Sequence, residues 1–140
     1  MKTKKQDQER HKAKTLAILT RHIGEEKAID MGELYRRVYD QDWKNKINDT
    51  RKLRKIITDL RYEGCLIGST YARSGGGYYI ARSSSELNEF FDRRKHEALK
   101  ILRLVASMKH MGLDEVLGQM ALNLRSGETE KRGNGETGNE

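Results

Sequence analysis

Apolar residues recur at helical spacing near the start of the chain, and this pattern stops at Gly24. The apolar positions are Ala13, Leu16, Ala17, Leu19 and Ile23. Spacings of three and four residues predict an amphipathic helix, which Gly24 is expected to end. Residues 1–10 contain no apolar residue besides Met1, so we expect them to form a disordered basic arm.

A short strand and a second helix are predicted next. The segment KAID (27–30) is long enough only for a short strand. Asp30 is the expected N-cap of the second helix, and Glu33 completes a capping-box-like pair with it. The apolar residues of this helix are Met31, Leu34, Tyr35 and Val38. The helical pattern is lost in DQDWKNK (40–46), where aspartate and asparagine favour a turn. Trp43 in this turn is either a packing anchor or a residue that stacks on a nucleic-acid base.

A third helix is predicted over residues 49–62. Asn48 or Asp49 is its expected N-cap, and Gly64 is expected to end it. At 100° per residue, the aliphatic residues gather within about 100° and define a buried face. These residues are Leu53, Ile56, Ile57 and Leu60.

Two strands joined by a glycine-rich turn follow the third helix, in the segment IGSTYARSGGGYYIAR (67–82). The residues that favour strands are Thr70, Tyr71, Tyr78, Tyr79 and Ile80. The glycines Gly75–Gly77 allow the chain to reverse through positive φ. We therefore predict a β-hairpin with an arginine on each arm, Arg73 and Arg82.

Two helices and a polar tail are predicted for residues 83–140. Ser83 and Glu86 open a long helix that is expected to end at Gly112. A final short amphipathic helix carries Leu113, Val116, Leu117, Met120, Ala121 and Leu124. Residues 125–140 are rich in Gly and Glu and are expected to be disordered. The fold class is thus α+β and mainly α, with a domain over residues 11–82 and a helical region over 83–124.

Charge separates the two halves of the chain. The formal net charge is +7, and hydrophobic and charged residues each make up 35% of the chain. Residues 1–82 hold 19 Lys and Arg against 11 Asp and Glu, whereas residues 83–124 balance at six of each. This asymmetry indicates a polyanionic partner such as nucleic acid, with a solubilising surface as the alternative.

Other classes of function find little support in the sequence. No apolar run approaches the roughly 18 residues of a membrane span, and a single cysteine allows no internal disulfide, so we expect a cytoplasmic protein. The glycine run lacks the Gly-Lys-Ser/Thr ending of a P-loop. We expect no metal and no cofactor, because the histidines lack ligand partners at suitable spacing; they are His11, His22, His96 and His110. Catalysis is not expected either. A Mg²⁺-dependent nuclease would need clustered carboxylates, and the nearest candidates in the sequence are Asp40, Asp42 and Asp49.

The side of the third helix opposite its aliphatic face has the chemistry of a DNA-reading surface. It combines Arg51, Lys55, Thr58 and Tyr62 and is flanked by Lys52, Arg54, Asp59 and Arg61. Arginine binds guanine bidentately, while lysine and threonine bind phosphates or base edges. A solvated helix face is the alternative reading of the same charges.

The order of elements over residues 11–82 resembles the winged helix-turn-helix DNA-binding family. NDTRKLRKIITDLRYEG (48–64) matches the recognition helix of that family, and CLIGSTYARSGGGYYIAR (65–82) matches its β-hairpin wing. Residues 60–110 are also similar to small winged-helix proteins encoded by bacteriophages and prophages. The resemblance implies double-stranded DNA as the partner, in transcription regulation or DNA replication. The residues expected at the DNA are Arg51, Lys52, Arg54, Lys55, Thr58, Arg61, Tyr62, Lys44, Lys46, Arg73, Ser74, Gly75 and Gly76.

The long C-terminal helix suggests self-association. Its apolar residues with a 3–4 spacing, interrupted by Arg94, are Leu87, Phe91, Ala98, Ile101, Val105 and Met108. This spacing is compatible with a coiled-coil seam and predicts a homodimer through residues 87–124. In one alternative the helix packs back on its own domain and on the helix over residues 113–124. In another, the chain is an adaptor whose apolar helices dock on a replication or transcription protein.

Overall fold

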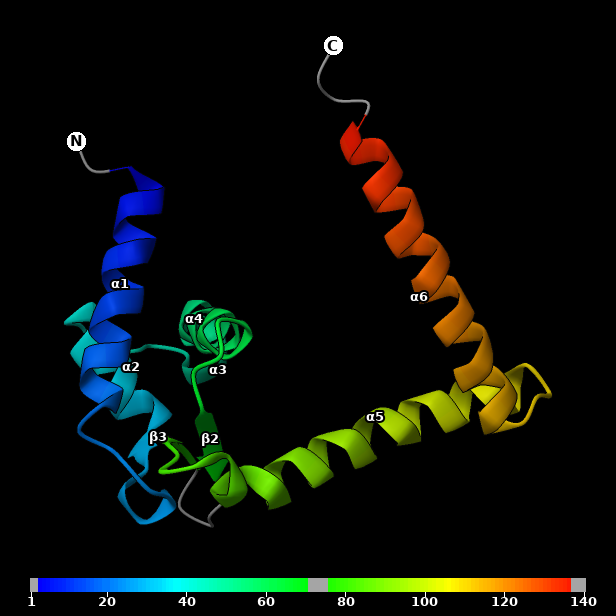
Figure 1. Ribbon diagram of the computed structural model, residues 1–140. Helices are drawn as coiled ribbons and strands as arrows, with labels where there is room; N and C mark the ends of the chain where they lie inside the picture. The colour runs from blue at the N-terminus through cyan, green and yellow to red at the C-terminus, as the bar shows by residue number, and fades with distance from the viewer. Residues whose placement is uncertain (1–2, 71–75, 137–140) are drawn as a thin grey trace. The chain divides into compact units, whose positions relative to one another are not determined.

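The computed structural model describes residues 3–70 and 76–136, with side chains described up to residue 127. Helices predominate, and three short strands form one antiparallel sheet, so the predicted α+β, mainly α class is confirmed (Figure 1). The chain divides into two compact units, Met1–Phe91 and Asp92–Glu140.

The first unit holds the sheet and most of the helices. Its elements are α1 (Lys4–Leu19), the 3₁₀ turn η1 (Glu25–Lys27), β1 (Ile29–Asp30), α2 (Met31–Tyr39), α3 (Lys46–Asp49), α4 (Arg51–Tyr62), β2 (Ile67–Thr70), β3 (Gly77–Ile80), η2 (Ser84–Leu87) and the first residues of α5 (Asn88–Met108). Helices α1 and α2 pack side by side, and α4 also contacts α1 (Figure 1).

Helix α1 begins earlier and ends earlier than the sequence pattern indicates. Thr3 caps it in a capping box: the Gln6 N–H donates to Thr3 Oγ1 at 3.3 Å, and the Thr3 N–H donates to Gln6 Oε1 at 3.0 Å. The expected disordered arm is thus corrected for residues 4–10, because Lys, Gln, Glu and Arg are good helix formers and the cap satisfies the first N–H groups. Ile23 lies beyond the helix and forms a parallel bridge with Ile80.

The turn between α2 and α4 contains a short helix that the sequence pattern did not reveal. Asn45 caps this helix, α3, its Oδ1 accepting from the N–H groups of Ile47 and Asn48. Asp49 instead accepts from the backbone of Lys44 and Asn45, at 2.6 and 3.0 Å. The expected N-cap of α4 at Asn48 or Asp49 is therefore wrong, because both residues belong to α3 and Thr50 occupies the cap position of α4.

Two other predicted helix signals are confirmed. Asp30 caps α2, accepting from the N–H groups of Gly32 and Glu33 at 2.9 and 3.3 Å. Gly64, at φ +96°, follows α4 in a Schellman motif, in which the Cys65 N–H donates to the Leu60 carbonyl. Glycine favours this left-handed position because it has no Cβ.

The core of the first unit forms where α1, α2 and α4 meet one face of the sheet. The predicted aliphatic face of α4 is confirmed, because all four of its residues are buried. The buried residues of this cluster are Leu19, Ile29, Leu34, Tyr35, Val38, Leu53, Ile56, Ile57, Leu60, Ile67 and Tyr78.

The sheet has the strand order β1-β3-β2, and its other face carries a second, smaller core. Strand β3 pairs with β2 from Ile67↔Ile80 to Thr70↔Gly77. Neighbouring side chains on β3 point to opposite faces, so Tyr78 joins the main core while Tyr79 packs in the second cluster. That cluster also contains Ala81, Leu87 and Phe90. The start of α5 thus belongs to the first unit, and the unit boundary lies after Phe91 rather than at residue 82.

The second unit contains the rest of α5 and helix α6 (Leu113–Glu136). Helix α5 ends at Met108 rather than at Gly112, because His110 takes the left-handed position of a Schellman motif, at φ 56°. Helix α6 continues past Leu124 to Glu136, so the expected disordered tail is corrected for residues 125–136. No proline interrupts this stretch, and glycine weakens a helix without ending it. None of the helices, over the residues described, combines the length and hydropathy of a membrane span.

Candidate nucleic-acid interface

Helix α4 presents a polar and cationic face to solvent. Arg51, Lys55, Thr58 and Tyr62 are all exposed, as the sequence pattern predicts. At 100° per residue they lie within about 60° of one another, directly opposite the buried face. Tyr62 is 88% exposed, an unusual position for a large aromatic side chain.

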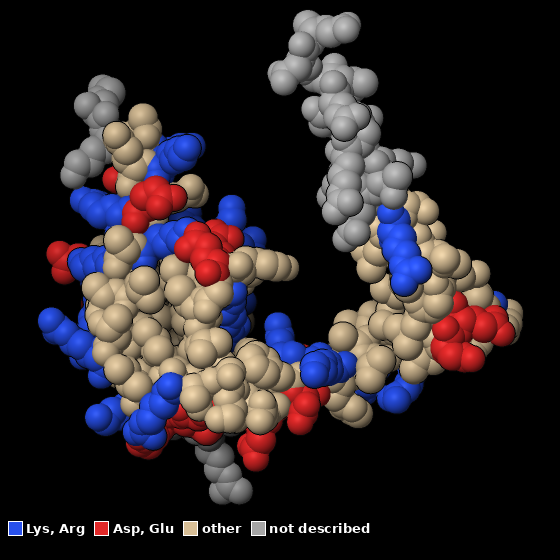
Figure 2. Space-filling view, in the orientation of Figure 1, with Lys and Arg blue, Asp and Glu red and all other residues tan. Residues whose placement is uncertain are grey.

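No carboxylate among the described residues lies within ion-pair distance of the cations on this face or of Lys52 on its flank. Within the described residues, the side chains of Arg51, Lys52 and Lys55 form no ion pair. Cations elsewhere on the unit do, such as Arg37, whose Nε lies 3.0 Å from Glu33 Oε1. Figure 2 shows Lys and Arg side chains over much of the first unit, with acidic groups among them. The unpaired cations of α4 leave a positive surface available to a polyanion.

The other polar residues of α4 fix local structure as well. One Arg54 guanidinium nitrogen, Nη2, donates to the Ile47 carbonyl at 2.6 Å and so ties α4 to α3. The hydroxyl of Thr58 donates to the Arg54 carbonyl at 3.0 Å. Both side chains remain exposed at their tips, so these bonds orient them without hiding them.

Lys44 and Lys46 lie in the segment that leads into α4. The backbone of Lys44 is held by Asp49, and the donated N–H groups of Asn45 and Lys44 lower the pKa of that carboxyl group. The hydrogen bond to Asp49 fixes the backbone from which the exposed side chain of Lys44 extends into solvent. Lys46 is half-buried, with Nζ 3.6 Å from Asp30 Oδ1.

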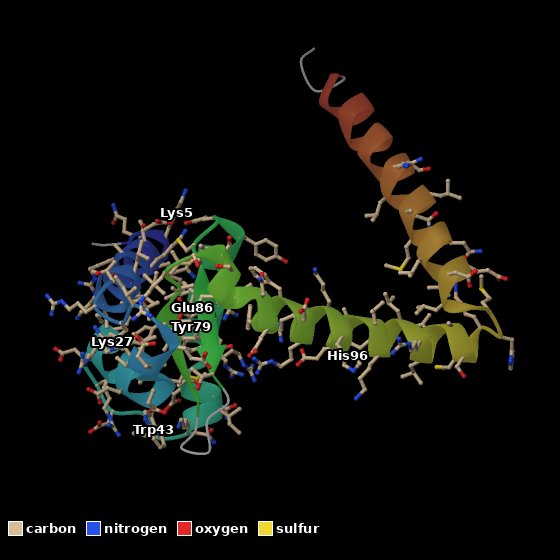
Figure 3. The ribbon with its side chains drawn as sticks, turned by 60° about the horizontal axis from the view of Figure 1, so that its bottom comes forward. Lys5, Lys27, Trp43, Tyr79, Glu86 and His96 are labelled. Carbon is tan, nitrogen blue, oxygen red and sulfur yellow. The ribbon has the colours of Figure 1, made fainter. Side chains whose placement is uncertain are left out.

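Trp43 is a packing anchor for this segment. Trp43 is half-buried, and its ring centroid lies 5.9 Å from the Arg36 guanidinium carbon and 5.8 Å from Lys46 Nζ. A Cβ at Gly32 would lie 2.7 Å from the indole Nε1, so α2 and the tryptophan ring are in close contact (Figure 3). Of the two readings left open by the sequence, these contacts favour packing over base stacking.

Arg61 has a different environment from the rest of the set. Its Nε donates to the Ile67 carbonyl of β2 at 2.9 Å, and its guanidinium carbon lies 5.9 Å from the Tyr78 ring centroid and 4.9 Å from that of Phe90. The side chain is half-buried and joins α4 to the hairpin. Its guanidinium thus packs against the hairpin and the start of α5, and its expected contact with DNA stays a prediction.

The hairpin tip is described only in part. Arg73, Ser74 and Gly75 lie outside the described residues, so their expected contacts stay predictions. Gly76 has φ +70°, and a Cβ there would lie 2.5 Å from the Thr70 carbonyl oxygen. Glycine is therefore required where the hairpin enters β3.

Ile47 is a candidate contact residue that the sequence analysis missed. It lies on α3, beside the start of α4, and is 71% exposed. The available signal is an isoleucine between the turn predicted over residues 40–46 and the expected helix cap at Asn48 or Asp49.

Comparisons with protein-family models, with curated proteins and with solved structures found no match to this chain. Nor does the described part of the chain gather three or more His, Cys, Asp or Glu side chains into a group suited to a metal ion. The interpretation of the site therefore rests on the geometry and charge of α4 and its neighbours.

Proposed function

We propose that this chain is a winged-helix protein that binds double-stranded DNA, with α4 as the recognition helix and the β2–β3 hairpin as the wing. The observation that carries the proposal is the outward face of α4, whose cations lack ion-pair partners among the described residues. The element order and the sheet order β1-β3-β2 support the winged-helix assignment. An α-helix fits the major groove, where base edges are distinguishable.

The residues on the outward face of α4 and around it have different roles in this proposal. Arg51, Lys55, Thr58 and Tyr62 face the major groove, where Arg51 and Lys55 contact base edges from the centre of the outward face. Ile47 offers an apolar contact to a thymine methyl group. The residues assigned to phosphates are Lys44, Lys46, Lys52, Arg54 and Arg73. The likeness of residues 60–110 to phage-encoded proteins favours a transcription regulator or replication factor acting in the cytoplasm of a bacterial or phage-infected cell.

Selection from a random pool of double-stranded oligonucleotides tests the proposal. We expect enrichment of a defined motif, and loss of binding to it in the variant R51A/K55A, at about 1–3 kcal/mol for each base contact removed. The variant R37A is the matched control, because it removes an exposed but ion-paired arginine on α2. A wild-type chain that enriches no sequence and binds no duplex would overturn the proposal.

An adaptor function is the second candidate, and the exposed apolar residues of α5 and α6 favour it. Among them are Ile101, Leu104, Met108 and Leu124. An adaptor would bind a replication or transcription protein through these helices and would keep this activity in R51A/K55A. A DNA-binding regulator would lose its function in the same variant.

A further inference from the structure

Helix α5 carries two apolar faces within the second unit, and one of them is open to solvent. Ile101, Leu104, Val105 and Met108 recur at i, i+3, i+4 and i+7, which places them on one side of the helix. Ile101 is 65% exposed and Met108 75%. Ala106, on another side, is buried. The Ile101 face therefore lacks a covering element among the described residues of this unit.

Helix α6 has an apolar stripe that, over the residues whose side chains are described, is buried near its start and exposed further along. Val116 is 5% exposed, whereas Leu117 and Met120 further along the same stripe are exposed and Leu124 is 67% exposed. In Figure 2, residues other than Lys, Arg, Asp and Glu cover much of the described part of α6. The apolar stripe thus continues past Val116 into residues that are exposed to solvent.

The two helices carry opposite net charge within this unit, because residues 113–136 of α6 hold five Asp and Glu against three Lys and Arg. Residues 92–108 of α5 hold five Lys and Arg against two Asp and Glu. The first turn of α6 instead carries two carboxylates, Asp114 and Glu115. A cationic apolar helix and a helix with an acidic start complement each other, whereas two copies of α5 would repel.

We propose that a second copy of this chain covers both faces, with α5 of each protomer packed on α6 of its partner. One chain supplies both complementary faces, so a twofold axis satisfies both contacts at once. Side chains at i, i+3, i+4 and i+7 on both helices provide the ridges and grooves for this packing. The pairing involves none of the residues of the α4 face, so it stands or falls independently of DNA binding.

The mass of the full chain in solution tests this directly, by sedimentation equilibrium across a concentration series. We expect a species of twice 16.2 kDa for the wild type and a monomer for I101E. S107E is the matched control, because it adds the same charge to another side of α5, and it should remain a dimer. A wild-type monomer at every concentration, or a dimeric I101E, would overturn the proposal. If the wild type is a monomer, a different protein would have to bind these two faces.

Mixing two defective variants tests which helices pair. M120E should also be monomeric. In a mixture of I101E and M120E, the intact α6 of the first can pack on the intact α5 of the second, so a fraction of dimer should return. Pairing of α5 with α5 predicts instead that M120E alone remains a dimer, because Met120 lies on α6, and that result would contradict the proposed arrangement. Circular dichroism of each variant checks that the helices persist, and binding of I101E to duplex DNA separates this test from that of the proposed function.

Discussion

The guanidinium carbon of Arg61 lies 4.9 Å from the centroid of the Phe90 ring. The same side chain donates from Nε to the Ile67 carbonyl at 2.9 Å. One residue of α4 therefore contacts both β2 and the first turn of α5, all within the first unit. This relationship makes Arg61 a positioning residue that orients the hairpin beside α4.

The variant R61Q tests this positioning role. It should reduce the free energy of unfolding by about 1–2 kcal/mol, because a hydrogen bond from a charged donor and a cation–π contact are both lost. Urea denaturation measures the change. DNA affinity should fall while its salt dependence stays unchanged, because no phosphate contact is removed. Unchanged stability with a salt slope reduced by about one would instead make Arg61 a phosphate ligand.

Tyr62 should show the opposite behaviour. Because its side chain is 88% exposed, Y62A should change the free energy of unfolding by less than about 0.5 kcal/mol. Duplex affinity, measured by fluorescence anisotropy, should nevertheless fall several-fold. A variant with wild-type affinity would remove Tyr62 from the proposed interface.

His110 offers a stability test of the second unit. It occupies the left-handed C-cap position after α5, where a residue with a Cβ is strained and glycine is not. We expect H110G to stabilise the chain by about 1 kcal/mol, with a raised thermal midpoint. An unchanged or lowered midpoint would show that His110 contributes a compensating contact.

His11 makes part of the stability dependent on pH. Its ring centroid lies 4.5 Å from that of Tyr39, and burial, followed by the charge of Arg10, lowers its pKa. Charges from other residues act on it too: Asp7 raises this pKa, while Lys14 and Lys52 lower it. Between the two pKa values the unfolded chain binds more protons than the folded one.

The stability that the folded chain gains from a neutral His11 is therefore fully present above the ordinary histidine pKa of about 6.5. It is lost as the pH falls from there toward the lowered pKa of His11 in the folded chain. The variant H11F keeps an aromatic ring beside Tyr39 but does not titrate. Urea midpoints measured on both sides of this range should fall less on acidification in H11F than in the wild type. An equal fall in both would exclude His11 as the cause.

The sequence predicted those parts of the fold that depend on periodicity and strong caps. The aliphatic face of α4, the Asp30 cap and the turn at Gly64 were each indicated by local residue patterns. The start of α1 and the end of α6 were not predicted. The polar composition of residues 4–10 and 125–136 suggested disorder, although neither segment contains a proline that would stop a helix. Helix α3 was missed because its four residues are too few to show a period.

The candidate site was predictable in its outline and not in its details. Periodicity alone placed Arg51, Lys55 and Tyr62 on an exposed face. The inward packing of Arg61 depends on Phe90, which is distant in sequence and reaches α4 only through the fold. The exposure of Ile47 depends in the same way on how α3 lies beside α4.

The salt dependence of duplex binding tests the central claim most directly. If Lys44, Lys46, Lys52, Arg54 and Arg73 together neutralise five phosphates, the logarithm of the binding constant should fall against the logarithm of salt concentration with a slope of about −4 to −5. A titration of the wild-type chain against a labelled duplex at several salt concentrations gives this slope. A slope near zero would contradict the account, because a cationic α4 face that binds DNA must release counterions.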